Sequence, residues 1–143
     1  MEKEVSSQEI THVVDHGIQD ESLAHLVFCA NYGIEVGVTL IVGGQVIAGD
    51  LVSGQQYAEQ AANSFRAANA DEKVKDTLAK FFDNLAEDYR PYEATEIPLN
   101  YLHIKDPSYL RGNGNWVKFN GSIMRIFISK VDGFSQGKPD TAK

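Results

Sequence analysis

Apolar and polar residues alternate with a period of two between Ile34 and Leu51, the pattern of a pair of half-buried β-strands. The alternation is interrupted by Gly43-Gly44, which suits a two-residue hairpin turn because both turn positions need a positive φ angle. Closing the hairpin there places the larger apolar residues of both strands on one face. The pattern therefore predicts a hairpin in which Val42 pairs with Gln45, Leu40 with Ile47, Val38 with Gly49, and Val36 with Leu51.

The stretch before this hairpin has the spacing of a helix from about residue 19 to residue 32. Leu23, Leu26, Val27 and Ala30 recur three and four residues apart. Asp20 can cap the start of this helix, and Gly33 can end it.

A longer helical pattern follows the hairpin, over residues 54–90. Ser53 and Gln56 fit a capping box at its start, and Arg90-Pro91 ends it. An unbroken helix of this length would extend roughly 55 Å, well beyond a domain with a radius of gyration of about 14 Å, and would need a partner to cover it. We therefore expect a break at residues 69–71. The apolar positions form two stripes: Tyr57, Ala61, Phe65 and Ala68, then Val74, Leu78, Phe81, Phe82, Leu85 and Tyr89.

The remainder of the chain reads as strands and turns. Residues 99–105 alternate as a strand, residues 106–108 are a turn signal, and residues 111–115 are a loop. The dipeptide Asn120-Gly121 predicts a second hairpin between residues 116–119 and 122–131. In that hairpin Val117 would pair with Met124, and Trp116 with Arg125. We expect residues 1–9 and 133–143 to be flexible because they are polar and terminal.

One face of this second hairpin is the candidate interaction surface. Val117, Phe119, Met124, Ile126 and Ile128 can supply the core face, which leaves a second face too apolar for bare solvent. Either the helical segment covers that second face or it is an interface, and tryptophan and arginine are residues that interfaces favour. The candidate interface consists of Trp116, Ile123, Arg125 and Phe127, with Val131 beside them.

These elements predict an α+β fold in one domain, residues 1–143. An N-terminal helix precedes a strongly bent antiparallel sheet of about five strands, and the helical insertion of residues 54–90 lies between the second and third strands. A small Sm-like barrel and a two-layer sandwich both explain the pattern.

Charge and composition argue against several classes of binding partner and location. The 143-residue chain carries a net charge of −7, which argues against a nucleic-acid partner and against anionic membranes. The charge is uneven, with 17 acids and 6 bases in residues 1–96 but 3 acids and 7 bases in residues 97–143. This asymmetry indicates either solvated surfaces of opposite charge or head-to-tail or polymeric self-association, which it would assist. No apolar run approaches the ~20 residues of a membrane helix. The acidic start lacks the pattern of a signal peptide, and the single cysteine, Cys29, fits a reducing cytoplasm.

No group of residues predicts catalysis, a cofactor site or a metal site. A phosphate loop would need glycines that lead straight into a helix, whereas Gly43-Gly44 leads into a strand. His12 and His16 have metal-ligand spacing but no third ligand. His103 is expected on the strand face turned away from the core, as a hydrogen-bonded histidine at the surface or in an interface, and Asp50 on a strand edge. Cys29 is most simply a packing residue.

Two segments resemble a known family. They are GVTLIVGGQVIAGDLVSGQQYAE and YLHIKDPSYLRGNGNWVKFNGSIMRIFISKVDGFSQG, within residues 33–137. Both resemble the U-type gas vesicle accessory proteins. The resemblance implies a small, cytoplasmic, non-enzymatic protein that helps to assemble or organise gas vesicles and carries no catalytic residues. The implied partners are further copies of the chain, the gas vesicle shell or other accessory proteins.

Two other functions remain open. An Sm-like RNA-binding module is supported by the basic bias of Lys105, Arg111, Lys118, Arg125 and Lys130, and would show RNA binding that weakens steeply with salt. A small enzyme would need a pocket with perturbed acidic groups.

Overall fold

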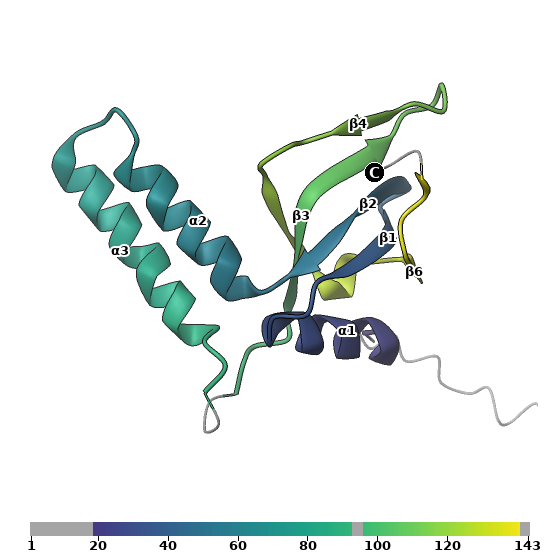
Figure 1. Ribbon diagram of the computed structural model, residues 1–143, viewed down its shortest axis with the longest axis horizontal. Coiled ribbons are helices and arrows are strands. Elements are labelled where there is room, and N and C mark those ends of the chain that lie inside the picture. The colour runs from purple at the N-terminus through teal and green to yellow at the C-terminus, as the bar shows by residue number, and fades with distance from the viewer. Residues whose placement is uncertain (1–18, 93–95, 141–143) are drawn as a thin grey trace, which may run out of the picture.

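The computed structural model describes residues 19–92 and 96–140, and places three helices and a six-stranded antiparallel sheet in an α+β arrangement (Figure 1). The predicted first hairpin is confirmed. Strands β1 (Val36–Val42) and β2 (Gln45–Val52) pair in the predicted register, from Val42 opposite Gln45 to Val36 opposite Leu51. Gly43 and Gly44 form the turn with φ angles of 57° and 81°.

Helix α1 (Glu21–Asn31) packs on one face of this hairpin. The side chain of Asp20 accepts a hydrogen bond from the amide of Leu23 at 3.0 Å, which confirms the predicted N-cap. Gly33 ends the helix with a φ angle of 100°. The main core lies between α1 and the sheet, and its fully buried members include Leu23, Val27, Ala30, Val38, Leu40, Leu51, Leu102 and Ile104.

The helical segment breaks where the sequence predicted. Helix α2 (Gly54–Arg66) and helix α3 (Glu72–Asp88) form an antiparallel hairpin that projects from one side of the sheet (Figure 1). Ser53 caps α2 by accepting from the amide of Gln56 at 3.0 Å. Asp71 caps α3 by accepting from the amide of Lys73 at 2.8 Å. Stacked rings of Phe65 and Phe82, with centroids 5.5 Å apart, join the two helices.

Strand β3 (Tyr101–Leu110) runs through the predicted turn at Asp106-Pro107, so that turn is wrong. On its β2 side, Ala48 pairs with Ser108 and Asp50 pairs with Lys105, so Gly49 alone lies opposite two residues in a β-bulge. Asp106 accommodates the bulge with a φ angle of 49°. A Cβ atom at Gly49 would lie 2.2 Å from Cγ2 of Ile104, so the close approach of the strands requires glycine there.

The predicted second hairpin is also wrong. Strands β4 (Trp116–Lys118) and β5 (Ile123–Phe127) do not pair with each other, because both pair with β3. The loop between them crosses the β3 bulge, where Asp106 Oδ1 accepts from the amide of Gly121 at 2.7 Å. Trp116 lies opposite Leu110, and Arg125 lies opposite His103. The Asn120-Gly121 turn therefore does not reverse the chain into a hairpin. It lies between two successive strands, β4 and β5, that both pair with the same side of β3.

The sheet stays open, so a closed Sm-like barrel is not confirmed. Its order is β4-β3-β2-β1-β6, with β5 also on the outer side of β3. A short 3₁₀ turn, Ile128–Lys130, leads to the last strand, β6 (Gly133–Gln136). This strand pairs with β1 in a part of the chain where the sequence predicted a flexible tail. Within the described residues, no helix has both the length and the apolar character needed to cross a bilayer.

Candidate functional site

Arg125 stands at the centre of an aromatic cluster on the sheet face opposite α1. It projects from β5 on the same face as Tyr101 and His103 of β3, since the three occupy directly opposed or alternate positions. Its guanidinium carbon lies 3.7 Å from the ring centroid of Tyr101 and 5.7 Å from that of Tyr57 in α2. It also donates from Nη2 to the hydroxyl of Tyr89 at 3.4 Å. We call this group, Tyr57, Tyr89, Tyr101, His103, Arg125 and Phe127, the Arg125 cluster.

His103 lies under the cluster, with 1% of its surface exposed. As predicted, it occupies the face turned away from the main core. Of the two predicted positions, surface or interface, the surface position is wrong, because the side chain is buried. The rings of Tyr57 and Tyr89 cover it at centroid distances of 4.8 Å and 5.4 Å. Neither ring nitrogen has a hydrogen-bond partner within the described structure. Burial, assisted by the nearby positive charge of Arg125, lowers the pKa of His103 to about 3, so the imidazole is neutral at pH 7.

The two covering tyrosines are held by the junction of the helices with the sheet. The amide of Gly54, at the start of α2, donates to Oδ1 of Asn31 at 2.9 Å. A Cβ atom at Gly54 would lie 2.2 Å from Cδ1 of Tyr89, so only glycine lets that ring close over the sheet. Tyr89 is fully buried as a result, and burial raises the pKa of its hydroxyl.

Among the residues that the structure describes, no acidic side chain pairs with Arg125. None of the ion pairs among the described residues involves it. Its Nε is buried and has no hydrogen-bond partner in the described part of the chain. The guanidinium is instead stabilised by the ring faces of Tyr101 and Tyr57. A half-buried cation without an acid can therefore accept one from a binding partner.

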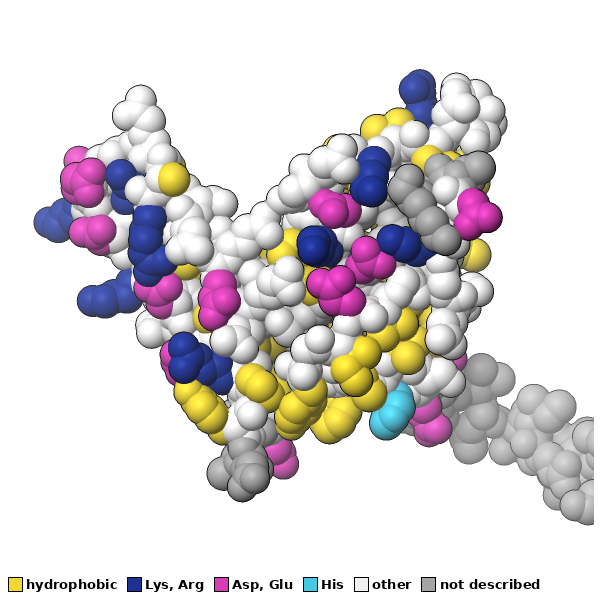
Figure 2. Space-filling view, in the orientation of Figure 1, with side chains coloured by type: hydrophobic (Ala, Val, Ile, Leu, Met, Phe, Trp, Pro, Cys, Tyr) yellow, Lys and Arg dark blue, Asp and Glu magenta, His cyan; other side chains and the backbone are white. Residues whose placement is uncertain are grey.

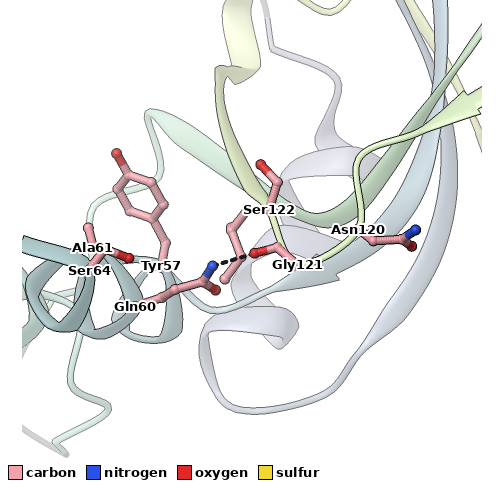
Figure 3. Close-up of a pocket in the computed structure, with 8 residues that line it drawn as sticks. Tyr57, Gln60, Ala61, Ser64, Asn120, Gly121 and Ser122 are labelled. Atoms are coloured by element: carbon pink, nitrogen blue, oxygen red, sulfur yellow. Dashed lines mark hydrogen bonds between the residues drawn. The ribbon is translucent and has the colours of Figure 1, made fainter. Parts of the chain in front are cut away.

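The helices cover this face only in part. Phe127 packs on Tyr101 at a centroid distance of 4.5 Å, yet 50% of its surface is exposed. Ile123, two residues before Arg125 on β5, leads from the cluster into a groove of about 300 Å³. Figure 3 shows this groove between α2 and the β4–β5 loop, bridged by a 2.6 Å hydrogen bond from Gln60 Nε2 to the carbonyl of Gly121. The cluster and the groove form one surface, rimmed by apolar and neutral polar groups.

The structure brings together three of the four residues predicted for the interface. Ile123, Arg125 and Phe127 share one face of β5. Trp116 is separated from them, because its partner Leu110 lies seven positions along β3 from His103, the partner of Arg125. Sequence reasoning missed Tyr57, Tyr89 and Tyr101. Tyr101 could have been found from the alternation of β3, whereas Tyr57 and Tyr89 depend on where the helices meet the sheet.

The other candidate residues lie elsewhere. Asp50 is not on a strand edge, since β2 lies between β1 and β3, and it forms an ion pair with Lys138 at 2.9 Å. Cys29 is half-buried on α1. His12 and His16 lie outside the described residues. Within the residues that the structure describes, no three histidine, cysteine or acidic side chains gather as a metal site would require.

Comparison with models of protein families identifies the family of this chain. The family model described as "Gas vesicle protein GvpU-like" matches residues 20–139, which include every helix and strand described above. Comparison with curated proteins and with solved structures gives no significant match. Because the match spans most of the chain, this protein belongs to the gas vesicle protein GvpU-like family.

Proposed function

We propose that this chain is a non-enzymatic, self-associating accessory protein that works in the cytoplasm and binds gas vesicle components during their assembly or organisation. The observation that carries the proposal is the family match over residues 20–139. The Arg125 cluster supports it, because it combines an exposed aromatic ring with a cation that pairs with no acid in the described part of the chain. Such a surface suits the recognition of another protein.

The chemistry of the cluster indicates what it would bind. Arg125 can donate to a carboxylate, and its guanidinium is already oriented on Tyr101. Phe127 lies beside it and is half exposed, so an apolar side chain of the partner that covers this ring would contribute to the free energy of binding. We infer that the partner surface on the vesicle presents an acidic side chain next to an apolar one. The groove beside Ile123 would accept the adjoining backbone or polar side chains.

Flotation tests this function. Purified protein is mixed with purified gas vesicles, the vesicles are allowed to rise, and the protein in the buoyant layer is measured at several salt concentrations. We expect the protein to float with the vesicles at low salt and to be released in part as salt screens Arg125. Protein that stays in the lower phase at every salt concentration would exclude direct vesicle binding.

Variants then locate the binding surface. Arg125→Gln and Phe127→Ser are each expected to reduce the floating fraction, since each removes one half of the proposed recognition. Arg111→Gln, in the exposed β3–β4 loop, is the charge-matched control, and Phe119→Ser, 45% exposed in the β4–β5 loop, is the aromatic control. If the controls weaken flotation as much as the cluster variants do, the Arg125 cluster is not the binding surface.

A further inference from the structure

Helix α3 has two apolar stripes, and α2 covers only one of them. The covered stripe contains Ala79 and Ala86, with 4% and 6% of their surfaces exposed, and Phe82 stacked on Phe65. The second stripe consists of Val74, Leu78, Phe81 and Leu85. Val74, Leu78 and Phe81 remain 52%, 36% and 61% exposed. An ordinary surface helix needs one apolar stripe, so the second stripe needs an explanation.

The spacing of the second stripe is that of a helix–helix seam. Its residues follow one another at intervals of four, three and four, which is the alternation of a coiled-coil heptad. The stripe lies on the helical hairpin that projects from the sheet (Figure 1), and a shallow hollow at its first half is lined by Asp71, Lys73, Val74, Thr77 and Leu78. A second helix can therefore reach the seam without meeting the sheet.

The charges of α3 are divided between its two halves. Residues 72–80 contain all three of its lysines, Lys73, Lys75 and Lys80, beside two acids, Glu72 and Asp76, whereas residues 81–88 contain three acids and no base. Acids near a helix C-terminus are unfavourable for the helix that carries them, because the dipole there is negative. Helix α3 thus presents an apolar seam whose first half has a small net positive charge and whose second half is acidic.

We propose that the occupant of this seam is α3 of a second copy of the chain, packed antiparallel. The two-fold axis would pass between Leu78 and Phe81, with Val74 beside Leu85 of the second copy. Lys73 would then lie near Asp88 of the second copy, and the dipole of each helix would oppose that of the other. A parallel pair would instead place lysine near lysine and acid near acid, at a cost in free energy. The proposal rests on the self-association included in the proposed function, and it assigns that association to α3 and leaves the Arg125 cluster free.

The first test measures mass in solution by size exclusion with light scattering, at about 10 to 100 µM chain. We expect the wild-type protein to have twice the chain mass and Phe81→Lys to have the mass of one chain. The variant should still unfold in one cooperative transition, because Phe81 is largely exposed in the single chain. Phe28→Lys, at a phenylalanine 43% exposed on α1, is the matched control and should leave the mass doubled. A monomeric wild-type protein, or a Phe81→Lys variant that keeps the doubled mass, would overturn the proposal.

The second test distinguishes the antiparallel arrangement. Lys73→Glu and Asp88→Lys should each raise the dissociation constant about fivefold, because each weakens two symmetry-related charge pairs. The double variant Lys73→Glu/Asp88→Lys restores opposite charges and should return the dissociation constant toward the wild-type value. A double variant weaker than either single variant would overturn the antiparallel seam.

Flotation separates this proposal from the proposed function. If the wild-type protein floats and Phe81→Lys has no effect on mass, the seam is wrong and the vesicle function stands. If Phe81→Lys is monomeric but the wild-type protein never floats, the seam stands and the vesicle function is wrong.

Discussion

At the scale of single residues, His103 makes the stability of the fold depend on pH. Its pKa is about 3 in the folded protein, below the ordinary value of about 6.5 expected in the unfolded chain. Between these two values the unfolded chain binds a proton that the folded chain does not. The stability that depends on a neutral His103 is therefore complete above about pH 6.5 and is lost as the pH falls.

We predict that protonation of His103 in the unfolded chain lowers the free energy of unfolding by about 2–3 kcal/mol as the pH falls from 7 to 4.5. His103→Phe removes the titration and keeps a ring of similar size, so its stability should fall less over this range. Urea denaturation of both proteins at a series of pH values measures the difference. Parallel stability profiles for the two proteins would show that His103 does not titrate on unfolding.

Gly54 illustrates a residue whose role cannot be seen from the chain alone. In the sequence it reads only as the residue after a helix cap, but in the structure it admits the ring of Tyr89. We predict that Gly54→Ala destabilises the protein by about 1–3 kcal/mol through overpacking, although alanine favours helices. The measurement is the free energy of unfolding in urea. An unchanged or higher stability would mean that Tyr89 moves aside at little cost.

At the scale of elements, local patterns predicted what depends on near neighbours. The β1–β2 register, the caps of α1 and α2 and the break between α2 and α3 were predicted correctly, because turn chemistry and periodicity fix them over a few residues. The pairing of β4 and β5 could not be predicted. The Asn120-Gly121 dipeptide turns the chain in either arrangement, and the bulge at Asp106 and Gly49, a contact between distant segments, decides that both strands join β3.

Asp106 offers a test of that bulge. Asp106→Val places a β-branched residue at a positive φ angle and removes the acceptor for the amide of Gly121. We predict a loss of about 2–4 kcal/mol in the free energy of unfolding. Asp106→Asn tolerates this backbone conformation and keeps an acceptor, so it should cost less than about 1 kcal/mol. If the two variants are equally stable, the bulge at Asp106 is not what separates β4 from β5 along β3.

The candidate site was predicted in part for the same reason. Alternation along one strand was enough to place Ile123, Arg125 and Phe127 on a common face. It could not show that α2 brings Tyr57 over His103, or that the strand offset moves Trp116 away from Arg125. The cluster is therefore built by long-range contacts around a core of residues that local periodicity can identify.

At the scale of the whole molecule, the two proposed surfaces are made of different residues. The Arg125 cluster belongs to the sheet, the first turns of α2 and Tyr89 at the end of α3, whereas the seam of Val74, Leu78, Phe81 and Leu85 lies along the length of α3. Figure 2 shows a notch between the helical hairpin and the sheet, and hydrophobic side chains gathered below the sheet in the region of α1. A chain that binds vesicles by one surface and a second copy by another could connect two vesicles.

The central claim is that the Arg125 cluster contacts gas vesicles, and hydroxyl-radical footprinting of the protein on intact vesicles tests it most directly. Mass spectrometry would report the oxidation of Phe127 and Tyr101 with and without vesicles, with Phe28 on α1 as the internal control. We predict that vesicles protect Phe127 and Tyr101 and leave Phe28 unchanged, in wild-type protein and in the Phe81→Lys variant alike. Oxidation of Phe127 that is the same with and without vesicles, in samples where the protein floats, would contradict the claim.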